Sequence, residues 1–258
     1  MDASTILSVL GMAAGKVIVK KATETLLDKK DNLYTYLQSN FTKIKDEDVR
    51  FSISYLIRIE IPDSSKYLLV RGHRIKDQMQ PVGGVYKKYD GFSEFENFGF
   101  KKDCDRKGIK SDDISKDDLR FRVKGKYALD VIKWFESRKN RETTFNREFA
   151  EELIEDHGFD PEIFGPHNQQ FREVQRVMNV FKYSTYHECY EVLIYDIVEF
   201  RPTPEQGEAL KKLLALPRTS NDDLMIVDLH EIEQLRVMEN GNQIAKIGEH
   251  TKYLINEK

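Results

Sequence analysis

The chain has 258 residues, of which 33% are charged and 40% hydrophobic, and its formal net charge at pH 7 is −3. This length can bury a full hydrophobic core, as one large domain or as one domain with an appendage. The small negative charge gives no global attraction to nucleic acids or acidic membranes, so we expect no nucleic acid partner. Only Cys104 and Cys189 are present, which argues against a disulfide scaffold and a zinc site and for a reducing compartment.

The N-terminal segment, residues 1–48, is predicted to be helical and separable from the rest of the chain, because its apolar residues recur three and four positions apart. Its longest apolar stretch, Ile6 to Val19, is interrupted by Lys16 and is too short to cross a bilayer. No convincing secretory signal is present, so we expect a cytoplasmic protein without a transmembrane segment. The apolar face must be covered by its own domain, by a second copy in a homo-oligomer, by a membrane surface or by another protein.

Strands are predicted to begin after this segment. Alternation of polar and apolar residues indicates a strand at 51–59, and an apolar run indicates a second at 67–71, so the two are expected to form an early hairpin. A third strand is expected to carry Val82 into the glycine pair Gly83-Gly84, where the backbone can pass close to a ligand.

Residues 86–142 are predicted to form a long insertion that ends with a helix at 127–135. Such an insertion usually shapes the mouth of a pocket. Its first half is rich in phenylalanine, and these rings could stack on a nucleobase or pack the insertion onto its domain. Both interpretations remain open.

The sequence is organised around an amphipathic helix predicted at 144–159, capped by Thr143 or Thr144 and ended by Gly158. Residues at four-residue intervals form an apolar stripe, and glutamates three and four residues apart form a second face. The stripe comprises Phe145, Phe149 and Leu153, and the acidic face comprises Glu148, Glu151 and Glu152.

Three carboxylates on adjacent turns repel one another unless a cation or an arginine lies among them. Oxygen ligands of this kind select a hard divalent ion, Mg²⁺ or Mn²⁺. Arg147 could hold one of the glutamates in position by a bidentate contact. The alternative is an acidic helix face that is simply solvated.

Two long strands are predicted beyond this helix, at 171–180 and 189–200, followed by a helix at 204–216 and a strand at 224–227. Glu191 interrupts an apolar run, where an unpaired carboxylate would be costly to bury. It therefore needs a metal ion or a cation such as Arg147, unless it faces water at a strand edge. His250 could place a polar group near a ligand, or serve as a cap or a satisfied core histidine.

The run from Arg147 to Glu152 reads Arg-Glu-Phe-Ala-Glu-Glu and resembles the core of the Nudix box, Arg-Glu-apolar-any-Glu-Glu. The upstream Gln80-Pro81-Val82-Gly83-Gly84 resembles the turn that precedes the catalytic helix in that family. The family normally has only a short loop between the two, whereas this chain inserts roughly sixty residues. The usual glutamate of that loop is replaced by Lys139, although Glu142 is close enough in sequence to substitute.

Further segments are similar to one branch, the SMODS-associated Nudix domains that accompany bacterial nucleotidyltransferases in CBASS-type antiviral signalling. They are Lys133-Trp134-Phe135 and His250-Thr251-x-x-Leu254-Ile255, and the resemblance covers roughly residues 50 to 255. It implies an α/β/α sandwich with a mixed sheet over residues 49–258. It also implies a metal site formed by the three glutamates, with Glu191 as a further ligand, and a substrate consisting of a nucleoside diphosphate linked to another group.

Two functions follow as hypotheses. The first is a Mg²⁺-dependent or Mn²⁺-dependent hydrolase of a nucleotide derivative, with Arg147, Glu148, Glu151 and Glu152 as the catalytic set. The second is a module that senses a nucleotide or cyclic oligonucleotide without cleaving it, which the replacement at Lys139 and the long insertion favour. In both, the residues expected to contact the ligand are Gly83, Gly84, Glu142 and His250. A scaffold whose acidic helix is vestigial is a third alternative.

Overall fold

A computed structural model describes residues 30–72, 78–89, 98–103 and 117–255. The predictions that fall on residues 1–29, including most of the N-terminal amphipathic segment, lie outside the described residues. The chain divides into two compact units, each assembled from three separate stretches. The first unit comprises residues 1–53, 85–143 and 178–194, and the second comprises 54–84, 144–177 and 195–258. The predicted boundary at residue 48 stays a prediction.

Helices α3 (Lys30–Phe41) and α4 (Ala128–Glu136) pack against each other in the first unit. Leu33, Tyr36 and Leu37 of α3 form a small buried cluster with Leu129 of α4. The described end of the N-terminal segment is therefore covered by the helix predicted for the end of the insertion. Short 3₁₀ turns at Lys43–Asp46 and Gly125–Tyr127 connect these helices to neighbouring strands.

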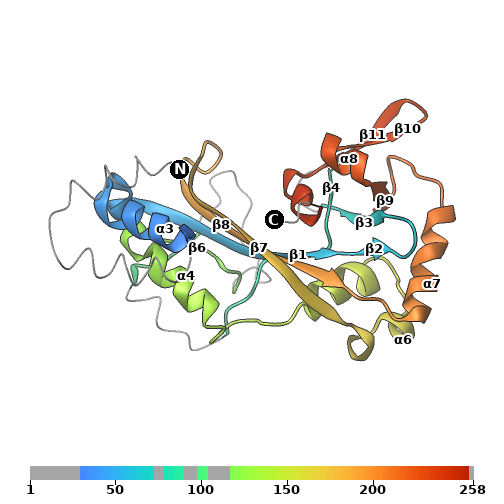
Figure 1. The fold of residues 1–258 in the computed structure, drawn as a ribbon, viewed down its shortest axis with the longest axis horizontal. Helices are drawn as coiled ribbons and strands as arrows, with labels where there is room; N and C mark the ends of the chain where they lie inside the picture. The colour runs from blue at the N-terminus through green and yellow to red at the C-terminus, as the bar shows by residue number, and fades with distance from the viewer. Residues whose placement is uncertain (1–29, 73–77, 90–97, 104–116, 256–258) are drawn as a thin grey trace. The chain divides into compact units, whose positions relative to one another are not determined.

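The first unit contains part of a five-stranded sheet (Figure 1). Its strands follow the order β5 (Lys101–Lys102), β6 (Arg120–Lys124), β1 (Asp48–Arg58), β8 (Cys189–Phe200) and β7 (Phe171–Ser184). The residues of β1, β7 and β8 are divided between the first and second units. The two strands predicted after the central helix are thus confirmed, and the earlier one extends to Ser184.

A second, six-stranded sheet lies within the second unit. Its order is β10 (Arg236–Glu239), β11 (Asn242–Ile247), β4 (Gln78–Gln80), β3 (Lys66–Arg71) and β2 (Glu60–Ile61), with β9 (Leu224–Asp228) paired to β3. Because β11 runs parallel to β4 while β3 is antiparallel to its partners, this sheet is mixed. The hairpin predicted between strands 51–59 and 67–71 is wrong in its first strand, because β1 belongs to the other sheet and the short strand β2 pairs with β3 instead.

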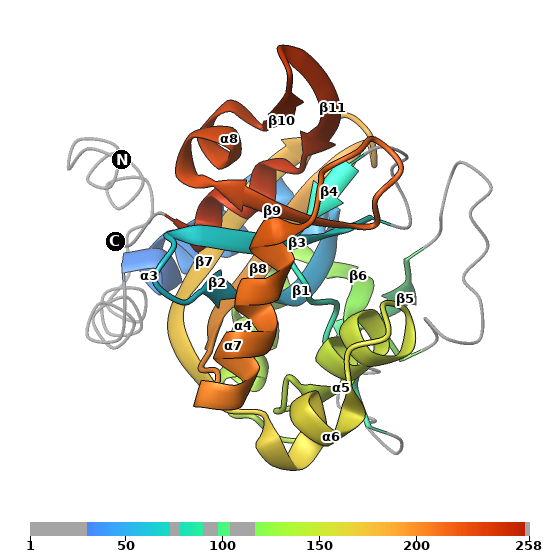
Figure 2. The ribbon, with the colours of Figure 1, turned by 90° about the vertical axis from the view of Figure 1, so that its right-hand side faces the viewer.

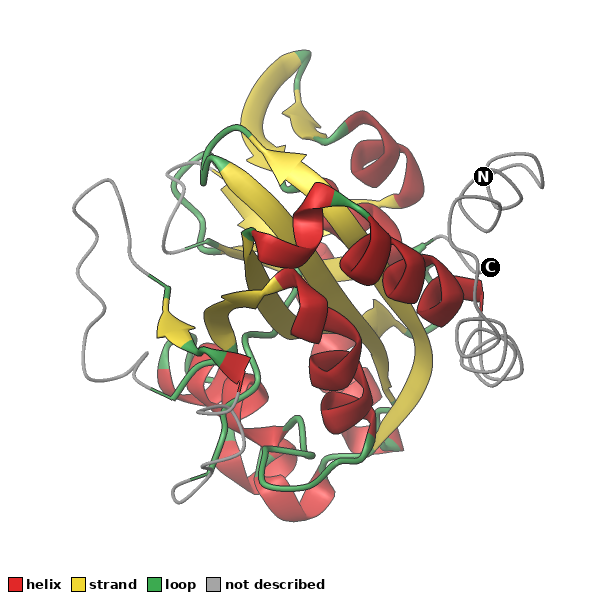
Figure 3. Cartoon of the chain, turned by 90° about the vertical axis from the view of Figure 1, so that its left-hand side faces the viewer, coloured by secondary structure: helices red, strands yellow, loops and turns green. Residues whose placement is uncertain are grey.

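Helices accompany the strands of the second unit (Figure 2), and the chain contains both helices and strands (Figure 3), so the predicted mixed α/β class is confirmed. The helices of the second unit are α5 (Asn146–Phe149), α6 (Pro161–Phe164), α7 (Pro204–Lys212) and α8 (Leu229–Gln234), with a π-helical segment at Ala150–Glu155 and 3₁₀ helices at Pro166–Asn168, Leu213–Ala215 and Glu249–Leu254. Capping boxes begin α7 at Thr203 and α8 at Asp228. No helix in the described part of the chain has both the length and the apolar composition needed to cross a membrane.

The hydrophobic core of the second unit joins the two sheets within it. Leu56 and Ile197, from the five-stranded sheet, belong to one buried cluster with Leu69, Met79 and Val227 from the six-stranded sheet. The opposite face of β8 contacts the central helix.

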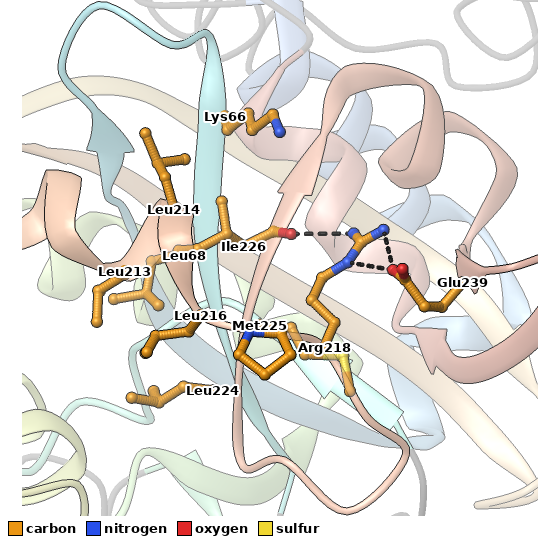
Figure 4. Close-up of a pocket in the computed structure, with 11 residues that line it drawn as sticks. Lys66, Leu68, Leu213, Leu214, Leu216, Arg218, Leu224, Met225, Ile226 and Glu239 are labelled. Carbon is orange, nitrogen blue, oxygen red and sulfur yellow. Dashed lines mark hydrogen bonds and ion pairs between the residues drawn. The ribbon is translucent and has the colours of Figure 1, made fainter.

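Arg218 bonds to three segments of the second unit, and we expect its replacement to be strongly destabilising. Its Nη1 donates to both carboxylate oxygens of Glu231, at 3.0 and 2.8 Å, and to the carbonyl of Ile226. Its Nη2 donates to the carbonyl of Met238 and lies 3.0 Å from Glu239 (Figure 4). Arg218→Met would leave the buried carboxylate of Glu231 without this partner, so we expect a loss of about 2–4 kcal/mol in unfolding free energy, measured by urea denaturation.

The matched control is Arg201→Met. Arg201 is a half-exposed arginine that lies 3.4 Å from Glu199. Because exposed ion pairs contribute little, this change should alter the unfolding free energy by no more than about 0.5 kcal/mol. Equal losses in the two variants would contradict the role assigned to Arg218.

Candidate functional site

The apolar stripe of the central helix is buried as predicted, whereas the start of the helix differs from the prediction. Helix α5 continues into a π-helical segment, Ala150–Glu155, in which Asp156 N–H donates to Glu151 C=O at 3.0 Å. The predicted threonine cap is wrong, because the N-cap is Phe145 and no side chain caps the first turn. The predicted stop is confirmed, since Gly158 has φ +67° and donates to Ile154 C=O. π-Helical turns are rare and often occur at functional sites.

The apolar stripe fixes this helix against aromatic neighbours in the second unit. Phe149 is fully buried, with its ring centroid 4.7 Å from that of Phe200 and 5.6 Å from that of Phe171. Phe145 packs edge-on against Tyr55 at 5.3 Å. Aromatic pairs of this geometry stabilise a packed element beyond their buried area. They hold the acidic face of the helix in one orientation.

Arg147 lies between two of the predicted metal ligands. Its Nη1 contacts Glu148 Oε1 at 2.6 Å and Glu151 Oε2 at 3.2 Å. The Glu148 side chain is largely buried, whereas that of Glu151 is nearly half exposed. The structure thus brings together three of the four residues of the predicted catalytic set, with the arginine supplying the cation that clustered carboxylates require.

Glu152, the fourth member, is the most buried carboxylate of this helix. Only 6% of the residue is exposed, and its Oε2 accepts a hydrogen bond of 2.8 Å from the N–H of Gly83. Burial, helped by the negative charges of Glu148, Asp156 and Glu151, raises the pKa of the Glu152 carboxyl to about 8, against the lowering effect of the Gly83 N–H. A strongly raised pKa marks a group whose environment lacks a compensating cation, and such groups are concentrated at functional sites.

The glycine pair lies against the glutamates of the central helix, at positions where a side chain would have no room. Gly83 has φ +142°, and a Cβ on it would overlap the carbonyl oxygen of Tyr55. A Cβ on Gly84 would instead overlap the carboxylate of Glu148. The predicted proximity of the glycine pair to the acidic helix is therefore observed: Gly83 contacts Glu152, and Gly84 leaves the space that Glu148 occupies.

This difference between the two glycines yields a prediction. Gly84→Ala should displace the end of a flexible Glu148 side chain, so we expect at least a tenfold loss of any metal-dependent activity with a loss of about 1 kcal/mol or less in stability. Gly83→Ala is the control, since its Cβ would meet rigid backbone at a strained φ, and it should destabilise the fold by more than about 2 kcal/mol. Chemical denaturation and activity, measured side by side, would contradict this if both variants were equally unstable.

A divalent ion suits the donor chemistry of these residues. Three carboxylates supply the oxygen ligands that Mg²⁺ and Mn²⁺ prefer, and the buried Glu152 is the group that an added cation would stabilise in its ionised form. In the described residues, however, no three His, Cys, Asp or Glu side chains are already arranged to hold an ion. Arg147 accounts for part of this, because it holds Glu148 and Glu151 on its own guanidinium.

Glu191, predicted as a further ligand, lies in the first unit. The expectation that its carboxylate needs a partner is confirmed, but that partner is Arg50, whose Nη1 lies 2.8 Å from Glu191 Oε1. His187 Nε2 is 3.8 Å from the same oxygen. Sequence patterns did not identify Arg50, because the two residues are 141 positions apart. A role of Glu191 as a metal ligand stays a prediction.

Glu142 and His250, predicted to contact a ligand, have other partners in the structure. Glu142 lies in the first unit, where its Oε2 accepts from the N–H of Lys87 at 3.2 Å. His250 lies parallel to Tyr195 with ring centroids 6.3 Å apart, and burial lowers the pKa of its imidazole. Tyr195 and Phe200 are five positions apart on β8 and so project from opposite faces. His250 therefore packs on the face of β8 opposite the central helix.

A separate cavity of about 220 Å³ is present in the second unit, between the outer face of β3 and β9 and the turn after α7 (Figure 4). Leucines and Ile226 line most of it, and Lys66, Arg218 and Glu239 are its charged residues. None of the residues predicted to bind a ligand or a metal, or to take part in catalysis, line this cavity. The candidate site therefore remains the group formed by the glycine pair and the central helix.

No curated protein and no solved structure matches this chain. A family model does match it, that of the SMODS-associated NUDIX domain, over residues 48–255. The matched region contains the glycine pair, the insertion, the central helix and His250. The chain therefore belongs to the SMODS-associated NUDIX domain family.

Proposed function

We propose that this protein is a Mg²⁺-dependent or Mn²⁺-dependent hydrolase of a nucleoside-diphosphate-linked or other nucleotide derivative, acting in bacterial antiviral nucleotide signalling of the CBASS type. The observation that carries the proposal is the buried Glu152, held by the Gly83 N–H at 2.8 Å beside Glu148 and Glu151. The family membership supports a nucleotide-related ligand. The cellular setting we propose is the bacterial cytoplasm.

Glu148, Glu151 and Glu152 would hold the ion in this proposal. When bound, the ion would neutralise diphosphate charge and lower the pKa of a water molecule. Arg147 orients Glu148 and Glu151 by the contacts already present, and so acts as a positioning residue. The N–H of Gly83 fixes Glu152, and the absent side chain at Gly84 gives Glu148 its space.

The test is incubation of the purified chain with Mg²⁺, and separately with Mn²⁺, against dinucleoside polyphosphates, ADP-ribose, NAD, nucleoside triphosphates and cyclic oligonucleotides. Products are separated by chromatography, and binding is measured in parallel. We expect metal-dependent release of a phosphate-terminated product from at least one compound, and its loss in Glu152→Gln. Absence of turnover with every compound and both metals would overturn the proposal of hydrolase activity.

A second candidate is a sensor that binds a nucleotide or cyclic oligonucleotide without cleaving it. The pairing of Arg147 with both Glu148 and Glu151 favours it, because the arginine neutralises two of the three carboxylates without a metal. Lys139 in place of the loop glutamate favours it as well. In the same experiment, binding without turnover that is unchanged in Glu152→Gln and in EDTA would establish this function.

A further inference from the structure

One face of the sheet in the first unit is buried yet charged. Along β1, the apolar residues Val49, Phe51 and Ile53 are fully buried on one side. On the other side lies Arg50, only 7% exposed, and the antiparallel register places it directly opposite Arg122 of β6, which is 8% exposed. A buried sheet face normally carries apolar side chains, so two facing arginines in this position require an explanation.

An internal carboxylate bridges the two arginines. Asp103 Oδ2 lies 2.6 Å from Arg50 Nε, and its Oδ1 lies 3.2 Å from Arg122 Nε. Like charges directly opposite on neighbouring strands repel, and burial strengthens the repulsion, so an anion between them is needed. One oxygen of Asp103 thus lies next to each guanidinium, and two oxygens of a phosphate could take the same two positions.

The carboxylate partners of this pair differ in how firmly the chain holds them. Glu191, the second partner of Arg50, lies within the twelve-residue strand β8. Asp103 follows the two-residue strand β5, whose lysines are exposed and which pairs with β6 at Lys101 and Lys102. Among the described residues, fewer strand hydrogen bonds flank Asp103 than flank Glu191, so we expect Asp103 to be the easier of the two to move away.

Asp103 supplies half of the negative charge among the four paired side chains of this group. Arg50 and Arg122 contribute +2, and Asp103 and Glu191 contribute −2, which gives a net charge of zero. His187 adds no charge near neutral pH, since burial and the charge of Arg50 lower the pKa of its imidazole. Among these four side chains, removal of the Asp103 carboxylate would leave a net charge of +1.

We propose that Arg50 and Arg122 form a binding site for a phosphate group, and that the carboxylate of Asp103 occupies this site in place of the ligand until a phosphate displaces it. The site would take the phosphate of a nucleotide-class or other phosphorylated small molecule. It is composed entirely of first-unit residues and uses no metal, so it stands whether or not the glutamates of the central helix hydrolyse anything.

The test uses inorganic phosphate as the probe, titrated into the full chain by calorimetry at constant ionic strength and with EDTA present. Asp103→Asn keeps the shape of the side chain and removes its charge. We expect this variant to bind phosphate with a Kd at least tenfold lower than that of the wild type. The double variant Asp103→Asn/Arg122→Gln should lose that gain. EDTA removes any contribution of a metal-bound phosphate, so this result is independent of the hydrolase test.

Asp196→Asn is the matched control. Asp196 is a buried carboxylate paired with Arg176 at 2.6 and 3.0 Å, so its replacement makes the same charge change next to an arginine outside the proposed site. It should gain no phosphate affinity. Equal affinity in Asp103→Asn and Asp196→Asn, or a gain that survives Arg122→Gln, would overturn the proposal. If Asp103→Asn does not fold, wild type and Arg122→Gln are titrated instead: loss of the weak wild-type binding supports the site, and unchanged binding refutes it.

Discussion

Glu148→Gln is expected to reduce metal-dependent turnover by about 10²–10³-fold, because an amide oxygen carries no net charge with which to hold a divalent ion against a diphosphate. The change is nearly isosteric, and Gly84 would still leave room for the side chain. Arg147 would lose one carboxylate and retain Glu151, 3.2 Å away. The fold should therefore persist while activity falls, as measured by initial rates with the cleaved compound and by unfolding midpoints.

Glu155→Gln provides the comparison for that experiment. Glu155 lies on the same helix and is exposed to solvent. Removing its charge changes the net charge of the helix by the same amount without touching the glycine pair. Its turnover should match that of the wild type. A similar loss in both variants would mean that the activity responds to the general charge of the helix, and would remove the specific role of Glu148.

Glu152→Gln is expected to change the pH dependence of stability. The pKa of this carboxyl is raised from the ordinary value of 4.5 to about 8 in the folded chain. The folded state therefore holds a proton that the unfolded state releases, so the contribution is fully present below about pH 4.5 and is lost as the pH rises toward 8. At about 1.4 kcal/mol for each pKa unit, the loss amounts to a few kcal/mol.

The measurement is urea unfolding at several pH values between 5 and 8.5 in EDTA, so that no divalent ion stabilises the ionised carboxylate. Between these limits the wild type should lose a few kcal/mol more stability than Glu152→Gln, which carries no titrating group at this position. Glu155→Gln should follow the wild-type curve. Parallel curves for the wild type and Glu152→Gln would show that Glu152 is not held in a desolvated environment.

Much of the candidate site follows from local sequence patterns. The four-residue spacing of Phe145, Phe149 and Leu153 predicts the buried side of the helix, and all three are buried. The glycine pair predicts a close backbone approach, which is observed at Glu148 and Glu152. These features depend on residues near one another in sequence or on the absence of a side chain, so the pattern contains the necessary information.

The features that could not be predicted depend on long-range pairing or on competition between neighbours. No local pattern indicates that Arg50 meets Glu191 and Asp103, since strand pairing in the folded chain brings them together. The predicted threonine cap is wrong because Phe145, one residue beyond Thr144, is the N-cap of α5, which begins at Asn146. The π-helical turn was also unforeseen, because apolar residues four positions apart suit an ordinary α-helix equally well.

The most direct test of the central claim, that this acidic helix is a divalent metal site, is Mn²⁺ binding followed by electron paramagnetic resonance. The wild type is expected to bind Mn²⁺ at one site, with the bound fraction retained in Glu155→Gln and lost in Glu148→Gln and Glu152→Gln. Addition of EDTA should release the ion. Binding that is absent from the wild type, or equal in all four proteins, would contradict the assignment of the glutamates as metal ligands.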